Sequence, residues 1–205
     1  MMFKHEIQLF NPVEVERTNP HYALLMREQL GGSNGELNSA MQYMAQSFKA
    51  KDTFIKDLLM DIATEELNHL EMVATIVNLL SGYDVDMDDG KKDAVFGLSP
   101  GIVNSSGCPW NFDSVSATGD LYADLISDIA SEQRSKAVYE YLFKQINDKK
   151  VRSAIDFLLE RETFHEKKLC EAIDRLKKEA PRKNYRFSKD SELCFSILSA
   201  KSVEL

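Results

Sequence analysis

The chain has 205 residues, enough for one domain with a buried core, and its 43% hydrophobic and 28% charged residues are typical of a folded globular protein. The net charge is -8 and no dense run of Lys or Arg occurs, which argues against nucleic-acid and anionic-membrane partners. The sequence shows no apolar stretch long enough for a signal peptide or a membrane span, so we expect a cytoplasmic origin. Three widely spaced cysteines (Cys108, Cys170 and Cys194) predict neither a disulfide framework nor a zinc site.

Helical spacing of apolar residues extends over most of the chain. It predicts a short helix near 20–30, a break at GGSNG, helices from about 34 to 50 and 53 to 81, and later helices from about 119 to 146 and 149 to 179, closed by Pro181. Six of the nine glycines lie between 82 and 119 and predict one long irregular connection. We therefore expect an all-α protein with an N-terminal segment (1–33), a four-helix bundle (34–180) and a tail (181–205). A crossover of about 82–118 would join the second and third bundle helices.

Two predicted helices carry a regular apolar stripe that is interrupted only by one Glu and one His. Over 53–81 and 149–179 the stripe residues follow steps of four and three, the spacing that keeps one face against a partner helix. The interruptions are Glu66 with His69, and Glu162 with His165. Burying a carboxylate and an imidazole is costly unless something compensates them, so both pairs require an explanation.

The spacing within each pair suggests metal binding. Residues three apart on a helix point the same way, so Glu-x-x-His can offer an oxygen and a nitrogen to one cation. Two of the four histidines have a Glu at this spacing, in EELNH and RETFH. The alternative is a pair of surface Glu/His contacts or hydrogen-bonded core histidines, and the matched placement on both stripes argues against it.

Two further acids extend the set. Glu132 lies in a helix whose buried side is outlined by Leu125, Ile129, Tyr139, Phe143 and Ile146, although Lys136 interrupts that stripe. Glu36 begins another helix and has an alternative role, because Ser33-x-x-Glu36 matches a capping box. If Glu36 is considered alone, the capping role is favoured. If it is considered together with the other acids, the ligand role is favoured.

A Glu on each of two helices and Glu-x-x-His on the other two is the pattern of ferritin-like di-iron and di-manganese bundles, which also need one long crossover. Carboxylate and imidazole ligands without thiolates suit iron or manganese. The sequence therefore predicts a ferritin-like four-helix bundle with a two-metal site in its core.

At these motifs the chain resembles the manganese catalases, and more closely the short catalase-like proteins of bacterial spore coats. The matching segments are LMREQLGGSNGELNSAMQYMAQSF, DIATEELNHLEMVATIVNLL, DIASEQRSKAVYEYL and VRSAIDFLLERETFHEKKL, within about 24–81 and 119–170. The GG-x-x-GEL and DIATEE-x-x-HLEM segments are the specific ones. In one respect the chain departs from the catalases, since it ends about 25 residues after its last bundle helix and they usually have a longer C-terminal segment.

The resemblance implies the metal ligands. Glu66 would bridge two manganese ions, Glu36 and His69 would complete one of them, and Glu132 and His165 would complete the other. Iron is the alternative metal.

The resemblance also implies roles for two residues outside the set of metal ligands, and a reaction. Glu162 would carry protons beside the metals, and Tyr43 would be a tyrosine hydrogen-bonded to the core, with an ordinary buried aromatic as its alternative. The reaction would be disproportionation of hydrogen peroxide to water and oxygen by a homo-oligomer, in the cytoplasm or built into a spore coat with other coat proteins. Two alternatives stay open: a ferritin-like di-iron peroxidase or oxidase, and a structural coat protein that retains the fold.

Overall fold

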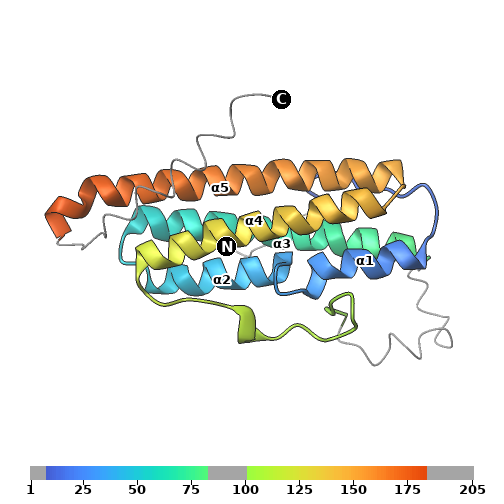
Figure 1. Cartoon of the computed structure of the whole chain (residues 1–205), viewed down its shortest axis with the longest axis horizontal. Helices are drawn as coiled ribbons and strands as arrows, with labels where there is room; N and C mark the ends of the chain where they lie inside the picture. Colours follow the sequence, from blue (N-terminus) through green and yellow to red (C-terminus); the bar gives the residue numbers. More distant parts are fainter. Residues whose placement is uncertain (1–7, 83–100, 184–205) are drawn as a thin grey trace.

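Five α-helices account for most of the residues that the computed structural model describes, 8–82 and 101–183. They are α1 (Pro20–Gly31), α2 (Glu36–Lys49), α3 (Thr53–Ser81), α4 (Leu121–Gln145) and α5 (Lys149–Lys183), with a short 3-10 helix η1 (Phe112–Ser114). The long helices run side by side along the molecule (Figure 1), and the predicted all-α, ferritin-like bundle is confirmed. Cys194 and the first part of the predicted crossover lie outside the described residues.

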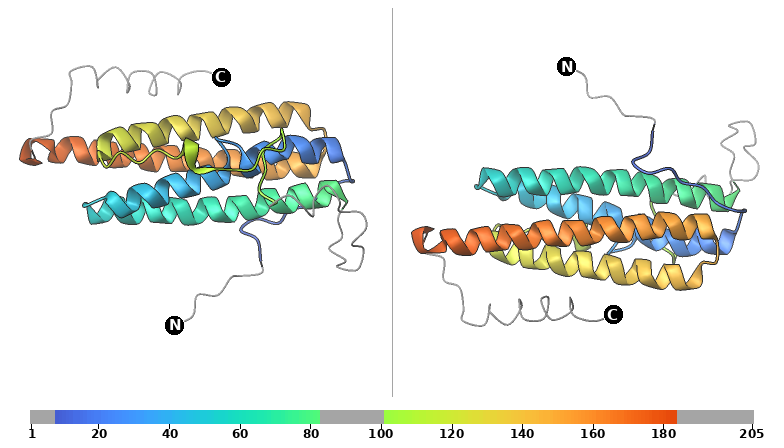
Figure 2. Two further views of the ribbon diagram at one scale, coloured as in Figure 1. Left: turned by 90° about the horizontal axis from the view of Figure 1, so that it is seen from below. Right: turned by 90° about the horizontal axis from the view of Figure 1, so that it is seen from above.

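The first position of the bundle is occupied by two short helices rather than one long one. α1 and α2 lie end to end along the bundle (Figure 2), and Met26 and Leu30 of α1 are buried in a core shared with α3, α4 and α5. The short helix that was predicted within the N-terminal segment 1–33 thus contributes side chains to the core of the bundle.

The glycines of the GGSNG break allow this arrangement because backbone approaches them closely. A Cβ atom added to Gly31 would lie 2.5 Å from the carbonyl carbon of Val103, and one added to Gly35 would lie 2.6 Å from the carbonyl oxygen of Gln29. Both separations are far below normal contact, so side chains cannot be accommodated there. The break starts α2 at mid-length of the bundle, where Glu36 is its first residue.

The last helix was predicted to close at Pro181, and α5 continues two residues further, to Lys183. Proline removes one backbone donor and crowds the carbonyl four residues before it. Close to the end of a helix this disturbs only the last turn, whereas in the interior it would break the element.

Two apolar cores lie at opposite ends of the bundle. One gathers side chains from α1 and from the halves of α3, α4 and α5 that adjoin it, including Met72, Leu142 and Ile155. The other gathers side chains from α2 and the opposite halves of α3, α4 and α5, including Leu59 and Leu125. The residues between them along each helix are buried but polar. The bundle thus has a polar layer between two apolar ones.

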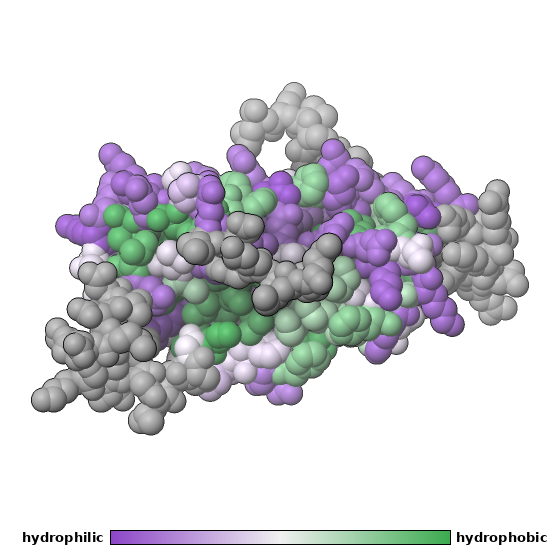
Figure 3. Space-filling view, turned by 180° about the vertical axis from the view of Figure 1, so that it is seen from behind, coloured by the Kyte–Doolittle hydropathy of each residue, from purple (hydrophilic) through white to green (hydrophobic). Residues whose placement is uncertain are grey.

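The described part of the crossover, residues 101–120, runs along the outside of the bundle to the start of α4 (Figure 1). Glu28 accepts hydrogen bonds from the backbone and hydroxyl of Ser105, and the backbone N–H of Ser116 donates to Gln42. The face behind that of Figure 1 carries both hydrophobic and hydrophilic residues (Figure 3). Among the described residues, no helix has the length and apolarity of a membrane span.

Candidate metal centre

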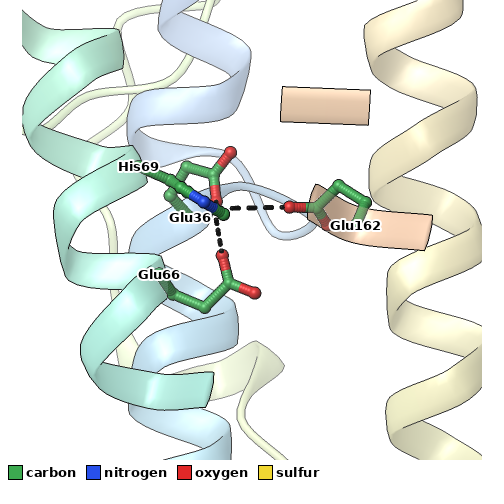
Figure 4. Close-up of side chains that lie close together, drawn as sticks. All are labelled: Glu36, Glu66, His69 and Glu162. Carbon is green, nitrogen blue, oxygen red and sulfur yellow. Dashed lines mark hydrogen bonds and ion pairs between the residues drawn. The ribbon is translucent and has the colours of Figure 1, made fainter. Parts of the chain in front are cut away.

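Six side chains from four helices converge in the polar layer, and each is at most 1% exposed. They form two groups that share two members, and within each group one nitrogen or oxygen atom per residue lies within 4.8 Å of the others. Figure 4 shows side chains of one group pointing toward one another. The groups are Glu36, Glu66, His69 and Glu162, and Glu66, Glu132, Glu162 and His165.

Glu66 of α3 lies at the centre. One of its carboxylate oxygens is 3.2 Å from Nδ1 of His69, and the other is 2.9 Å from Nδ1 of His165. Burial and the charge of Glu162 act to raise the pKa of Glu66, but the two imidazoles outweigh them and lower it. An ionised carboxylate with one oxygen toward each imidazole is suited to bridging two cations.

Glu36 does not form the capping box that its sequence permits. The N-cap of α2 is Gly35, no side chain caps the helix, and Glu36 points into the core. Its Oε2 is 3.6 Å from Nδ1 of His69, and its Oε1 accepts a hydrogen bond from the hydroxyl of Tyr139. Burial, and then the charge of Glu66, raises the pKa of Glu36 to about 7. The structure therefore excludes the capping box and places Glu36 beside His69 in the buried polar layer.

Glu132 and Glu36 are held by reciprocal tyrosines. The hydroxyl of Tyr43 on α2 donates to Glu132 on α4, and the hydroxyl of Tyr139 on α4 donates to Glu36 on α2. Burial, followed by the charge of the adjacent carboxylate, raises the pKa of each tyrosine well above 10, so both remain protonated donors. Tyr43 was predicted for this place. Tyr139 was predicted only as a buried aromatic, although it follows Glu132 at the seven-residue spacing that separates Glu36 and Tyr43.

Glu162 of α5 belongs to both groups. Its Oε1 is 3.5 Å from Nδ1 of His69 (Figure 4), and among the described residues neither carboxylate oxygen has a hydrogen-bond donor. Because Glu162 reaches both groups of side chains, its position fits the predicted role of proton carrier.

The unpaired atoms of this layer fit bound cations. Buried atoms without a hydrogen-bond partner within the described chain include Glu132 Oε2 and both oxygens of Glu162. Leaving such atoms unpaired in a dry interior costs free energy, and so many carboxylates repel one another. Burial and the charges of Glu162 and Glu66 accordingly raise the pKa of Glu132 well above 4.5. Two divalent cations with oxygen and nitrogen ligands would satisfy these lone pairs and offset the repulsion.

Comparison with known proteins identifies the family. A family model described as manganese containing catalase matches residues 2–198. The chain belongs to the manganese catalase family. It is 54% identical to a probable manganese catalase of Clostridium acetobutylicum, over 96% of this chain and 90% of that protein.

Two other matches also cover most of the chain. Protein CotJC of Bacillus subtilis is 36% identical, over 89% of this chain and 98% of that protein. The crystal structure of KatB, a manganese catalase from Anabaena PCC7120, superimposes with a TM-score of 0.77 at 34% identity, covering 85% of this chain and 81% of that one. The predicted family is confirmed, and with it a manganese-dependent catalase acting on hydrogen peroxide.

Sequence analysis missed a buried carboxylate beside this manganese catalase site. Asp128, one turn before Glu132 on α4, accepts hydrogen bonds of 2.8 Å from the side-chain amides of Gln42 and Gln46. Burial raises the pKa of Asp128 to about 8, although the two amides act to lower it. The sequence predicted an apolar stripe on the buried side of α4 that did not include Asp128. In the structure Asp128 is buried, whereas predicted stripe members such as Ile129 are only half-buried.

Sequence analysis also missed an ion pair at the edge of the site. Arg161 on α5 contacts the carboxylate of Glu65 on α3 through Nε at 2.5 Å and Nη2 at 3.1 Å. Burial acts to raise the pKa of Glu65, but His165, His69 and Arg161 hold it far below its ordinary value. Each residue immediately precedes the Glu of a Glu-x-x-His pair, which is the only sign of this pairing in the sequence.

Proposed function

We propose that Glu36, Glu66, His69, Glu132 and His165 hold the two manganese ions, with Glu66 shared between them. Glu36 and His69 would complete one ion, and Glu132 and His165 the other. The single observation that carries this assignment is the pair of overlapping four-residue groups, in which several buried ligand atoms lack any hydrogen-bond partner among the described residues.

In the proposed reaction, two molecules of hydrogen peroxide give two of water and one of oxygen. The manganese pair supplies a two-electron redox couple, which allows peroxide to be oxidised and reduced without releasing a radical. Glu162 takes up and returns protons at its carboxylate, which lies beside both ligand groups. Tyr43 and Tyr139 fix the carboxylates of Glu132 and Glu36 from the facing helices.

The direct test is an oxygen-electrode assay with peroxide, combined with elemental analysis of the same sample from manganese-supplemented and iron-supplemented cultures. We expect about two manganese ions per chain and oxygen evolution that scales with manganese content. A chain that fills with iron alone, or that holds manganese but evolves no oxygen, contradicts the proposal.

We also propose that the protein assembles as a homo-oligomer and is built into a spore coat with other coat proteins. Phe48 and Phe112 are 69% and 57% exposed, apolar surface that a subunit contact would cover. Coat placement is supported by the resemblance to the short catalase-like coat proteins, and the close match in length to Protein CotJC agrees with it. Light scattering on purified protein and immunolabelling of spore sections test the two parts separately, with a monomer or unlabelled coats contradicting them.

A further inference from the structure

Two consecutive glutamates of α3 lie on opposite sides of the imidazole pair. The oxygens of Glu66 face the Nδ1 atoms of His69 and His165, at 3.2 and 2.9 Å. The oxygens of Glu65 face the Nε2 atoms of the same rings, at 3.6 and 3.4 Å. The rings are stacked, with centroids 5.5 Å apart and planes 25° from parallel. Each imidazole therefore has a carboxylate oxygen near both of its nitrogens.

The Nε2 atoms have no other acceptor. Both are buried and have no hydrogen-bond partner within the described chain, and the carboxylate oxygens of Glu65 face them at 3.6 and 3.4 Å. Both separations lie beyond the usual range of an N–H···O hydrogen bond, so these are close ion-pair contacts rather than hydrogen bonds. Among the residues that the structure describes, Glu65 is the one carboxylate that faces the Nε2 atoms of both rings.

Arg161 fixes the orientation of that carboxylate. Its guanidinium contacts both oxygens of Glu65, the two-point geometry that makes Arg–carboxylate pairs strong and directional. The guanidinium is itself packed 4.4 Å from the ring centroid of Phe164 and 6.0 Å from that of Phe10. With Glu65 held at both oxygens, neither imidazole can draw the carboxylate away from the other.

We infer that Glu65, oriented by Arg161, is a positioning residue that serves both metal-binding imidazoles at once. An acceptor at Nε2 keeps the proton on that nitrogen, which leaves the lone pair of Nδ1 directed at the proposed manganese ions. This inference rests on the proposed function. It adds that manganese affinity at both metal positions depends on one carboxylate that is not itself a ligand.

The Glu65–Arg161 ion pair can be removed without opening the core. The side chains of Glu65 and Arg161 are 21% and 25% exposed, so their substitution leaves no sealed cavity. Asp61 is an exposed acid one turn earlier on α3, and Lys167 is an exposed base two residues after His165 on α5. Substitution of either gives the same change in net charge away from the imidazoles and serves as a matched control.

The experiment is a manganese titration of the metal-depleted full-length protein, with free Mn²⁺ followed by electron paramagnetic resonance. For Glu65→Ala we expect both binding steps to weaken by about 10- to 100-fold, the usual effect of losing an outer partner of a metal-bound histidine. Glu65→Gln weakens less, since one amide oxygen can accept from one ring. Asp61→Ala leaves both steps unchanged, and the thermal midpoint of metal-free Glu65→Ala stays close to that of the wild type.

A double-mutant cycle tests whether Arg161 acts through Glu65. We expect Arg161→Gln alone to weaken manganese binding, Lys167→Gln to have no effect, and Arg161→Gln to add nothing in the Glu65→Ala background. A persistent effect of Arg161→Gln there overturns its positioning role. Unchanged affinity in Glu65→Ala, beside a wild type that binds two ions, overturns the inference alone. A wild type that takes up no manganese contradicts the proposed function as well.

Discussion

The two sides of the site fix their ligands by different means. On the α2–α4 side, each of two carboxylates, Glu36 and Glu132, is bonded by a tyrosine hydroxyl from the other helix. On the α3–α5 side, two imidazoles face one carboxylate, Glu65, which an arginine holds at both oxygens. The first side is buried and neutral at its supports, whereas the second is charged and partly exposed.

This difference follows from what each ligand needs. A carboxylate has lone pairs to spare and requires a donor, so a phenol whose pKa is raised by burial suits it. A neutral imidazole has one donor and one acceptor, so directing its lone pair inward requires an acceptor on its outer edge. The α2–α4 side can therefore be closed to water, while the ionised acceptor of the α3–α5 side is placed near the surface, where charge is better tolerated.

The largest effect is expected where the two sides meet, at Glu66. Glu66→Ala removes the group that faces both imidazoles, so it should abolish oxygen evolution and eliminate binding of both manganese ions. Glu36→Ala, which removes a group facing only His69, should leave one ion bound. Elemental analysis with the oxygen-electrode assay measures both. Full activity in Glu66→Ala removes the bridging assignment, and Asp61→Ala is the charge-matched control.

The next effect concerns the folding equilibrium on the α2–α4 side. Burial raises the pKa of Asp128 from 3.8 to about 8, so between these values only the folded state keeps the proton. Raising the pH through this window therefore lowers the free energy of unfolding, and the loss is complete above the folded pKa. Asp128→Asn removes this dependence, and at pH 8 the metal-free variant should be more stable than the wild type, on the order of 5 kcal/mol.

Urea unfolding of the two metal-free proteins at pH 4 and pH 8 measures this difference. Near pH 4 the two should be alike, because Asp128 is then largely protonated in the folded wild type. A constant difference at both values shows that the substitution changes packing or hydrogen bonds with Gln42 and Gln46 rather than a proton equilibrium.

The features predictable from the sequence are those carried by one helix at a time. The steps of four and three around Glu66 and His69, and around Glu162 and His165, require no knowledge of the partner helix. Cross-helix relations are different. Tyr139 bonds a carboxylate 103 positions away, and Arg161 bonds one 96 positions away, so spacing within a helix cannot identify these partners.

Helix ends and breaks limited the prediction of the fold in the same way. The glycine break before Glu36 marks where a helix stops, and the local pattern cannot show that α1 and α2 share one position of the bundle. Pro181 likewise predicts a helix end, but whether the last turn continues depends on the surroundings of α5. The resemblance to the manganese catalases indicated the family and implied a set of ligands that remains a prediction, and it did not include the tyrosine of α4 or the ion pair.

The smallest effect is expected at the two tyrosines of the α2–α4 side, where it tests whether their two contacts are equivalent. Tyr43→Phe and Tyr139→Phe each remove one hydroxyl and leave a buried ligand oxygen without its donor. Because the two contacts are reciprocal, we expect equal losses of manganese affinity of about tenfold, each confined to the ion that the affected carboxylate holds. Tyr141→Phe, at a side chain 56% exposed on α4, is the control and should bind manganese as the wild type does. If only one of the two buried tyrosines matters, the supports of Glu36 and Glu132 are not equivalent, and the site depends mainly on the carboxylate whose tyrosine is needed.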